Sequence, residues 1–188
     1  MDSSALPFVI GAVVLIPVLW VVVTYNGFVR HRNFCDDSWS DIDTELKRRY
    51  DLIPNLVDTV KGYAKHEQDL LARVVAARNA AAAQHGSPKE QARDENAFVG
   101  QVRQLVAVAE SYPDLKASGN FVALQSELAN TEDRIQRARR FYNANVRDLN
   151  TRIEVIPSNI IANLFGFQKR EYFEVDDVVR REAPAVKV

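Results

Sequence analysis

Three histidines and one cysteine are the side chains in this sequence best suited to metal binding or nucleophilic catalysis. His31, His66 and His85 are widely separated, and none has a glutamate three residues before it. A dinuclear carboxylate site in a helical bundle needs Glu-x-x-His on two helices, so the sequence predicts no such site. Cys35 is the only cysteine, which excludes a disulfide framework and a cysteine-based zinc site.

Motifs for covalent or phosphate chemistry are also missing from the sequence. It contains neither a Gly-x-Ser-x-Gly elbow nor a glycine-rich phosphate loop. His66 and Glu67 are adjacent, so on a helix they point about 100° apart. We therefore expect no catalytic residues, no metal, no cofactor and no enzymatic activity.

The charges are distributed unevenly along the 188 residues, a length that suits one modest domain. No lysine or arginine precedes Arg30, and Asp2 is the only acidic residue before it, so residues 3–29 form an uncharged run. The remainder carries 24 basic and 24 acidic residues. This balance argues against nucleic acid as a partner, because binding its backbone requires an excess of positive charge.

The uncharged run has the length of a membrane-spanning helix. Residues 5–23 are mostly aliphatic or aromatic and are interrupted only by Pro7, Gly11 and Pro17. About 20 apolar residues cross a bilayer. A signal peptide and a buried core helix are the alternatives, but the start is acidic and the run is long. We predict a short segment 1–4, then a transmembrane helix over 5–25 that anchors the chain in the bilayer.

The positive charges at Arg30 and Arg32 directly follow this predicted span. Positive residues are retained on the cytoplasmic side of a membrane. We therefore expect a single-pass protein of the inner (cytoplasmic) membrane, with its N-terminus outside and its helical domain in the cytoplasm.

Beyond the span, apolar residues recur every three or four positions, the spacing of amphipathic helices. Ser87, Pro88 and Glu90 form a capping box with proline at the first helical position. We expect helices at about 30–84, 88–112, 119–154 and 159–165, within a bundle domain over 30–173 and before a flexible tail at 174–188. The predicted fold is all-α: the transmembrane helix followed by an antiparallel bundle of long helices.

Several residues interrupt this pattern and are candidate structural or partner-binding positions. Pro54 removes a backbone hydrogen bond inside a predicted helix, which favours either a kink or a hinge used in binding. Glu67 and Arg78 fall on the apolar stripe, so they either reach solvent at its edge or pair with charges of the third helix. The full set of candidates is Pro54, Asn55, Glu67, Arg78, Tyr112, Pro113, Glu132, Arg139 and Arg140.

Arginines also recur every three residues at Arg134, Arg137 and Arg140. They could bind anionic lipid or an acidic partner. Asp133 precedes Arg137 by four residues, so a solvated, self-neutralised face is the alternative.

Many ordered segments closely resemble the LemA family. They cover roughly residues 20–173 and include the sequences at 25–26, 39–43, 46–57, 60–63, 66–67, 111–117, 120–121, 124–125, 131–132, 134–135, 138–140, 142–143, 157–162 and 165–167. The resemblance implies a bacterial single-pass membrane protein with a bundle of long helices. It supplies no set of catalytic residues.

Together these observations predict a membrane-anchored scaffold or adaptor that acts by binding an unknown membrane protein, with self-association as a further expectation. Tethering raises the effective concentration of partners in the same membrane. Two alternatives remain open. One is a non-catalytic subunit or regulator of a membrane protease or envelope-stress system, and the other is a homo-oligomeric protein that organises membrane.

Overall fold

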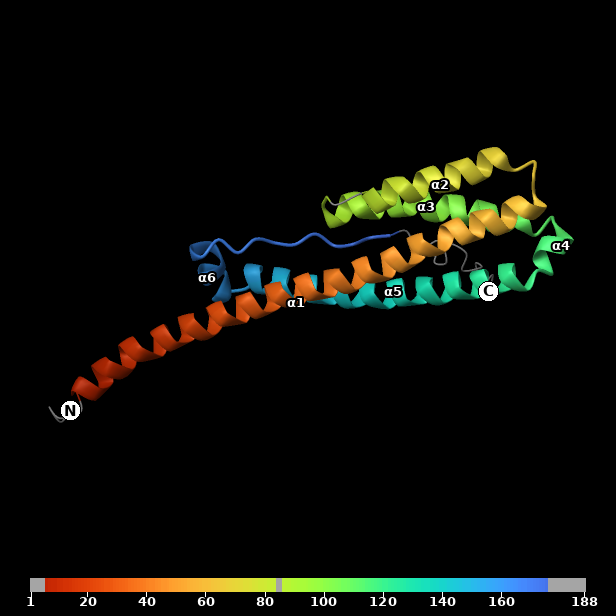
Figure 1. Cartoon of the computed structure of the whole chain (residues 1–188). Helices are drawn as coiled ribbons and strands as arrows, with labels where there is room; N and C mark the ends of the chain where they lie inside the picture. Colours follow the sequence, from red (N-terminus) through yellow and green to blue (C-terminus); the bar gives the residue numbers. More distant parts are fainter. Residues whose placement is uncertain (1–5, 84–85, 176–188) are drawn as a thin grey trace, which may run out of the picture. The chain divides into compact units, whose positions relative to one another are not determined.

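The computed structural model describes residues 6–83 and 86–175, without the side chains of residues 6–10 and 12. The predicted segment 1–4, His85 and nearly all of the predicted tail at 174–188 lie outside the described residues. All regular elements in the described part are helices, which confirms the all-α prediction. They are α1 (Leu6–Tyr63), α2 (Gln68–Ala83), α3 (Pro88–Ala109), α4 (Pro113–Lys116), α5 (Gly119–Glu154) and α6 (Ser158–Leu164) (Figure 1).

The prediction of one helix over about 30–84 is wrong, because the chain breaks between α1 and α2. The amide of Ala64 donates to Val60 O at 2.8 Å, and the amide of Glu67 then donates to Ala64 O at 3.1 Å, which forms a turn. Val60, Ala64 and Leu71 are all buried. The apolar spacing therefore continues across the turn, so periodicity alone could not distinguish one helix from two.

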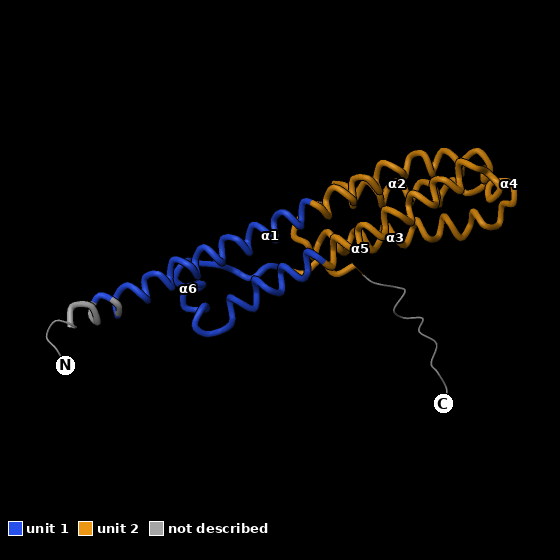
Figure 2. Tube along the Cα trace, turned by 90° about the horizontal axis from the view of Figure 1, so that it is seen from below, with its two compact units in different colours: residues 1–40, 141–170 blue, residues 41–140, 171–188 orange. Residues whose placement is uncertain are grey.

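The chain also divides into two compact units rather than one bundle domain over 30–173. Unit 1 contains residues 1–40 and 141–170, and unit 2 contains residues 41–140 and 171–188 (Figure 2). The two longest helices, α1 and α5, contribute to both units. Helices α2, α3 and α4 belong to unit 2 alone, and α6 belongs to unit 1.

Unit 2 is a bundle of neighbouring antiparallel helices made from the C-terminal part of α1, helices α2 and α3, and the N-terminal part of α5 (Figure 1). Helices α2 and α3 pack against each other. The predicted capping box starts α3: Glu90 N donates to Ser87 Oγ, and Ser87 N donates to the Glu90 carboxylate. The unit's buried apolar residues include Ile42, Leu46, Ile53, Leu56, Val60, Leu71, Val74, Phe98, Leu105, Leu115, Phe121 and Ile135.

Unit 1 contains α6 and the parts of α1 and α5 that share the unit. Its buried residues include Phe28, Cys35, Tyr142, Val146, Leu149, Ile161 and Ala162. Asn145 Nδ2 links α5 to α1, donating to Phe34 O at 3.2 Å and to Ser38 Oγ at 3.1 Å.

Helix α1 differs from the other helices in its length and hydropathy. Among the described residues, α1 is the one helix long and apolar enough to cross a membrane. Large apolar side chains near its N-terminus, among them Leu15, Val18 and Leu19, are exposed rather than buried by other helices. A core helix of a globular protein would bury such side chains.

Candidate functional site

A buried ion-pair network occupies the centre of unit 2. Arg49 of α1 donates from Nη2 to the Glu95 carboxylate of α3 and from Nη1 to Glu132 Oε2 of α5 at 2.7 Å. Glu95 is 0% exposed and Arg49 is 5% exposed. Charges are rarely buried unless they are paired, because removing them from water is costly. This network therefore connects three helices through one guanidinium.

Tyr50 and Gln91 extend the network around Glu95. The Tyr50 hydroxyl donates to Glu95 Oε1. Gln91 Nε2 lies 3.1 Å from Glu95 Oε1 and 3.1 Å from the carbonyl oxygen of Ala81 in α2. Gln91 is 6% exposed. Both carboxylate oxygens of Glu95 thus accept hydrogen bonds, and all four long helical segments of unit 2 contribute a partner.

Aromatic rings enclose these polar groups. The Arg49 guanidinium lies over the Phe98 ring at 5.3 Å, and the rings of Tyr50 and Phe98 meet edge to face at 5.9 Å. Burial is the main cause that lowers the pKa of Arg49 and raises the pKa of Tyr50 to about 12. Tyr50 therefore stays a neutral hydrogen-bond donor at physiological pH.

One hydrogen bond, from Arg78 to the carbonyl of Tyr50, accounts for the positions of both Pro54 and Arg78. Proline has no amide hydrogen, so Pro54 leaves the carbonyl of Tyr50, four residues earlier, without its helical donor. Arg78 Nε of α2 donates to that carbonyl at 3.2 Å, and its guanidinium lies 6.0 Å from the centre of the Tyr50 ring. Helix α1 continues through Pro54. A buried carbonyl that lacks a partner destabilises the fold, so Arg78 compensates for the proline.

Of the two alternatives for Glu67 and Arg78, the structure does not show the pairing with third-helix charges. Glu67 lies in the turn between α1 and α2, where its Oε1 accepts from the Tyr112 hydroxyl at 3.2 Å. Arg78 binds Tyr50 as described. Of the proposed third-helix partners, Glu132 does form an interhelical ion pair, but its partner is Arg49.

The other candidates lie apart from one another. Pro54 and Asn55 are exposed on α1, and Pro113 is the first residue of α4. Arg139 donates to the carbonyl oxygen of Val175, and Arg140 is exposed. Arg134 of the proposed arginine patch approaches Glu45 of α1 at 3.8 Å. The structure therefore brings Pro54 and Arg78 to one place, and Glu67 and Tyr112 to another.

The sequence does not predict that one network joins Arg49, Tyr50, Gln91 and Glu95. A signal was present in α3, because Gln91, Glu95 and Phe98 follow each other at spacings of four and three residues on the buried face. Polar residues that continue an apolar stripe are candidates for a buried network. The partner of each residue depends on how the helices meet, which the spacing does not reveal.

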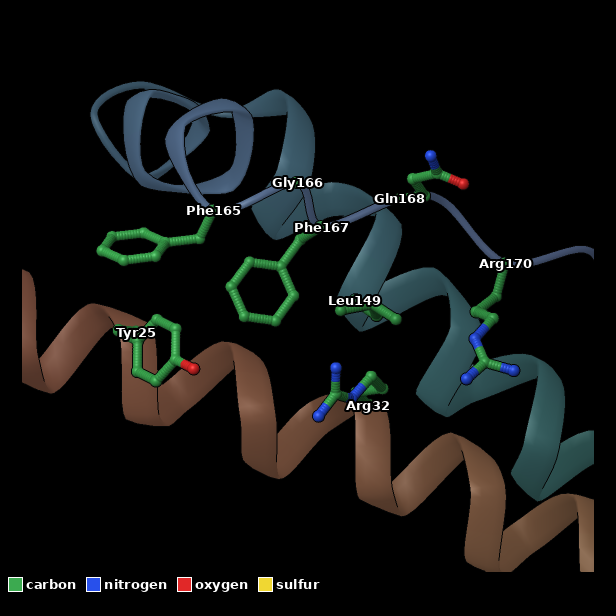
Figure 3. Close-up of a pocket in the computed structure, with 8 residues that line it drawn as sticks. All are labelled: Tyr25, Arg32, Leu149, Phe165, Gly166, Phe167, Gln168 and Arg170. Atoms are coloured by element: carbon green, nitrogen blue, oxygen red, sulfur yellow. The ribbon is translucent and has the colours of Figure 1, made fainter.

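Unit 1 holds a second feature, an aromatic cavity of about 300 Å³ beside α1. The rings of Phe165 and Tyr25 lie 4.8 Å apart, and Phe167 stacks on Phe28 at 4.8 Å. In Figure 3, Phe165 and Phe167 point towards α1 from the segment after α6, and Arg32 lies below Phe167. The Arg32 guanidinium is 5.9 Å from the Phe167 ring centre.

A glycine turn and a polar clamp position these rings. Gly166 has φ 70°, and Phe167 N then donates to Ala162 O at 2.9 Å, which is the Schellman ending of a helix. Further along, Asn150 Nδ2 donates to Arg170 O, and Arg170 N donates to Asn150 Oδ1, both at 2.9 Å. The extended segment between these contacts is therefore fixed at both ends.

His31 and Cys35 both lie on α1, four residues apart. Cys35 is fully buried in unit 1, and burial raises the pKa of its thiol. Burial lowers the pKa of His31, whose ring meets Phe34 edge to face. His66 is exposed in the turn after α1. Within residues 6–83 and 86–175, no three His, Cys, Asp or Glu side chains are grouped as metal ligands would be.

Comparison with known proteins identifies relatives over most of the chain. Magnetosome protein MamQ 2 of Paramagnetospirillum magneticum is 25% identical over 197 aligned positions, covering 88% of this chain and 72% of the relative. Protein LemA of Metamycoplasma hominis is 25% identical over 158 positions, covering 82% of this chain and 71% of the relative. The model of the LemA family matches residues 38–188. The chain therefore belongs to the LemA family.

Proposed function

We propose that this protein is a membrane-anchored helical scaffold or adaptor that acts by binding other proteins and has no chemistry of its own. The observation that carries the proposal is the continuity of α1 from Leu6 to Tyr63. One helix contains exposed apolar residues such as Val18 and also supplies Arg49 to the network of unit 2. An anchor built in this way keeps a helical binding surface at the membrane, where partners are concentrated.

The apolar segment supports anchoring through lipid rather than through protein packing. Val13, Val14, Leu15 and Ile16 are each more than half exposed in the described structure. Large contiguous apolar surfaces are unfavourable in water and are typical of membrane contact. Three relatives carry the name magnetosome protein, and another is named LemA, so these names leave the partner to be identified.

Site-specific photocrosslinking in the membranes of the producing cell tests the proposal. A photoreactive amino acid at Val75 or Val122, both exposed in unit 2, would be activated in the full-length protein. We expect discrete adducts with another membrane protein. Adducts of twice the chain's mass alone would instead support the homo-oligomeric alternative. Absence of protein adducts at either position would contradict the scaffold proposal.

We further propose that the helical domain lies on the cytoplasmic side of the inner membrane. Arg30 and Arg32 follow the apolar segment, and positive charge flanks a span on the cytoplasmic side. A cysteine at exposed Asn55 should react with a membrane-impermeant maleimide only after the cells are permeabilised. Labelling of intact spheroplasts would reverse the proposed orientation. Cys35 is buried and should contribute little background.

A further inference from the structure

The segment around α6 exposes a large apolar face in unit 1. Ile156, Ile160 and Leu164 recur every fourth residue and are 82%, 61% and 71% exposed. Ile161 and Ala162 on the other side of the helix are buried against the unit. Ile160 and Leu164 are four residues apart in α6 and share one face of it, and Ile156 precedes them in the turn before the helix. We call these three exposed residues the apolar ridge. Val155 and Phe165, each about half exposed, extend it at the two ends.

No charged residue interrupts this ridge. Residues 155–168 contain no Asp, Glu, Lys or Arg, and the nearest charges are Glu154 and Lys169, which pair with each other. Exposed apolar ridges of this kind are rare on surfaces that face only water. The composition and the exposure both indicate that the ridge meets an apolar phase.

The ridge ends beside the last part of the apolar segment of α1. The ring of Phe165 lies 4.8 Å from that of Tyr25, and the ring of Phe167 lies 5.7 Å from it. Tyr25 follows the apolar run of residues 5–23. Aromatic residues concentrate at the membrane–water interface. If α1 crosses a bilayer, the end of α6 is therefore at the level of that interface.

Positive groups lie at the corresponding level of α1. Arg30 and Arg32 come five and seven residues after Tyr25, so they are about 8 and 10 Å further along the helix. Arg152 of α5 reaches the same region, because a Cβ atom at Gly27 would lie 3.5 Å from its Nη1. Guanidinium groups at this height can bind the phosphates of lipid headgroups.

We propose that the apolar ridge formed by Val155, Ile156, Ile160, Leu164 and Phe165 inserts into the bilayer interface at the end of the span that Tyr25 and Arg30 follow. This inference rests on the proposed membrane anchoring by α1. The occupant is lipid rather than a second copy of the chain, because the ridge continues from the apolar segment and is accompanied by arginines at headgroup height. Unit 1 then contacts the membrane at two places, through the span and through α6.

Spin-label accessibility in the full-length protein tests this contact. Single cysteines would replace Ile160, Leu164 and, as a control within the same unit, Phe141, in a Cys35→Ala background. Phe141 is 60% exposed, and its neighbour Tyr142 packs against Trp39, fourteen residues beyond Tyr25 along α1. A fourth label at Val18 reports on the span itself. The protein would be reconstituted into phosphatidylcholine vesicles that contain phosphatidylglycerol.

Oxygen concentrates in the bilayer, whereas a water-soluble nickel chelate is excluded from it. We expect the ratio of oxygen to nickel accessibility to be severalfold higher at residues 160 and 164 than at residue 141, and highest at residue 18. A high ratio at 18 with a low, 141-like ratio at 160 and 164 would overturn the insertion of α6 and leave the anchor intact. A low ratio at 18 as well would overturn the anchor. Poor access of both reagents at 160 and 164 would indicate a protein contact and also contradict insertion.

Discussion

Unit 2 buries charges, whereas unit 1 exposes apolar side chains. In unit 2, Glu95 and Arg49 are removed from water and are ion-paired across neighbouring helices. In unit 1, aromatic contacts connect α1 to the segment after α6, and Ile156 and Leu164 remain exposed. Buried ion pairs add specificity only when their partners are in register, while aromatic contacts tolerate an adjacent lipid phase. Unit 2 therefore stores its polar groups in paired contacts between helices, whereas unit 1 presents apolar side chains at its surface.

Breaking the charge network of unit 2 should cause the largest loss of folding stability. Glu95→Leu leaves Arg49 buried with only the partly exposed Glu132, and removing one member of a buried pair costs about 3–5 kcal/mol. Urea unfolding of the full-length protein in detergent would measure the change. The matched control is Asp43→Leu, which removes the exposed 2.9 Å pair with Lys47 and should cost under about 1 kcal/mol.

Adding Arg49→Met to Glu95→Leu should recover most of that loss, because both buried charges are then gone. The comparison between the units would fail if the double variant were as unstable as the sum of the two single variants. It would also fail if Glu95→Leu cost no more than Asp43→Leu.

The second prediction concerns alkaline pH. The pKa of Tyr50 is raised from 10 to about 12, chiefly by burial. Between these values the unfolded chain has lost the phenolic proton and the folded chain has kept it. Stability from this group is therefore full below pH 10 and is lost as the pH rises through 12, a change of about 2–3 kcal/mol.

Tyr50→Phe should remove the part of the stability loss at alkaline pH that comes from this phenol. The urea midpoint of the variant should therefore fall less than that of the wild type between pH 10 and pH 12. Tyr63→Phe serves as the control, since that ring is exposed at the end of α1. Parallel curves for the wild type and Tyr50→Phe would show that Tyr50 is not buried as described.

The third prediction concerns the energetic coupling between Pro54 and Arg78 in unit 2, and its expected size is intermediate. Arg78→Met should cost about 1–2 kcal/mol, because the carbonyl of Tyr50 loses its donor. In a Pro54→Ala background the helix supplies its own amide to that carbonyl, so the same substitution should cost clearly less. A double-mutant cycle measures the difference. Equal costs of Arg78→Met in the two backgrounds would refute the coupling.

Some of these features could be predicted from the sequence and others could not. Apolar spacing predicted the helical class, and Ser87 with Glu90 marked the start of α3, because both signals are local. The turn at residues 64–67 escaped prediction because Val60, Ala64 and Leu71 keep the helical spacing across it. Pro54 predicts the loss of one backbone hydrogen bond within a helix, but the donor that replaces it at Tyr50 O, Arg78, depends on how α2 packs on α1. Such contacts are tertiary, so no regular spacing of residues in the sequence predicts them.

The smallest expected effect lies in unit 1. Gly166 has φ 70°, a conformation in which a side chain costs about 1–2 kcal/mol, although a Cβ atom there would meet nothing within 4 Å. Gly166→Ala should therefore loosen the ring contacts of Phe165 and Phe167 through backbone strain alone. Amide exchange of α6 should accelerate severalfold while α3 stays protected. Gly100→Ala, in open space within α3, is the control and should not speed exchange.

We propose that α1 anchors this LemA-family protein in a bilayer, and alkaline carbonate washing of isolated membranes tests this anchoring. The full-length protein should stay in the membrane pellet. Leu15→Arg combined with Leu19→Arg should move it to the supernatant, because each arginine in a span costs about 3 kcal/mol. Val75→Arg with Val122→Arg, in unit 2, should leave it in the pellet. Wild-type protein released by carbonate, or the Leu15→Arg/Leu19→Arg variant retained in the pellet, would contradict the account.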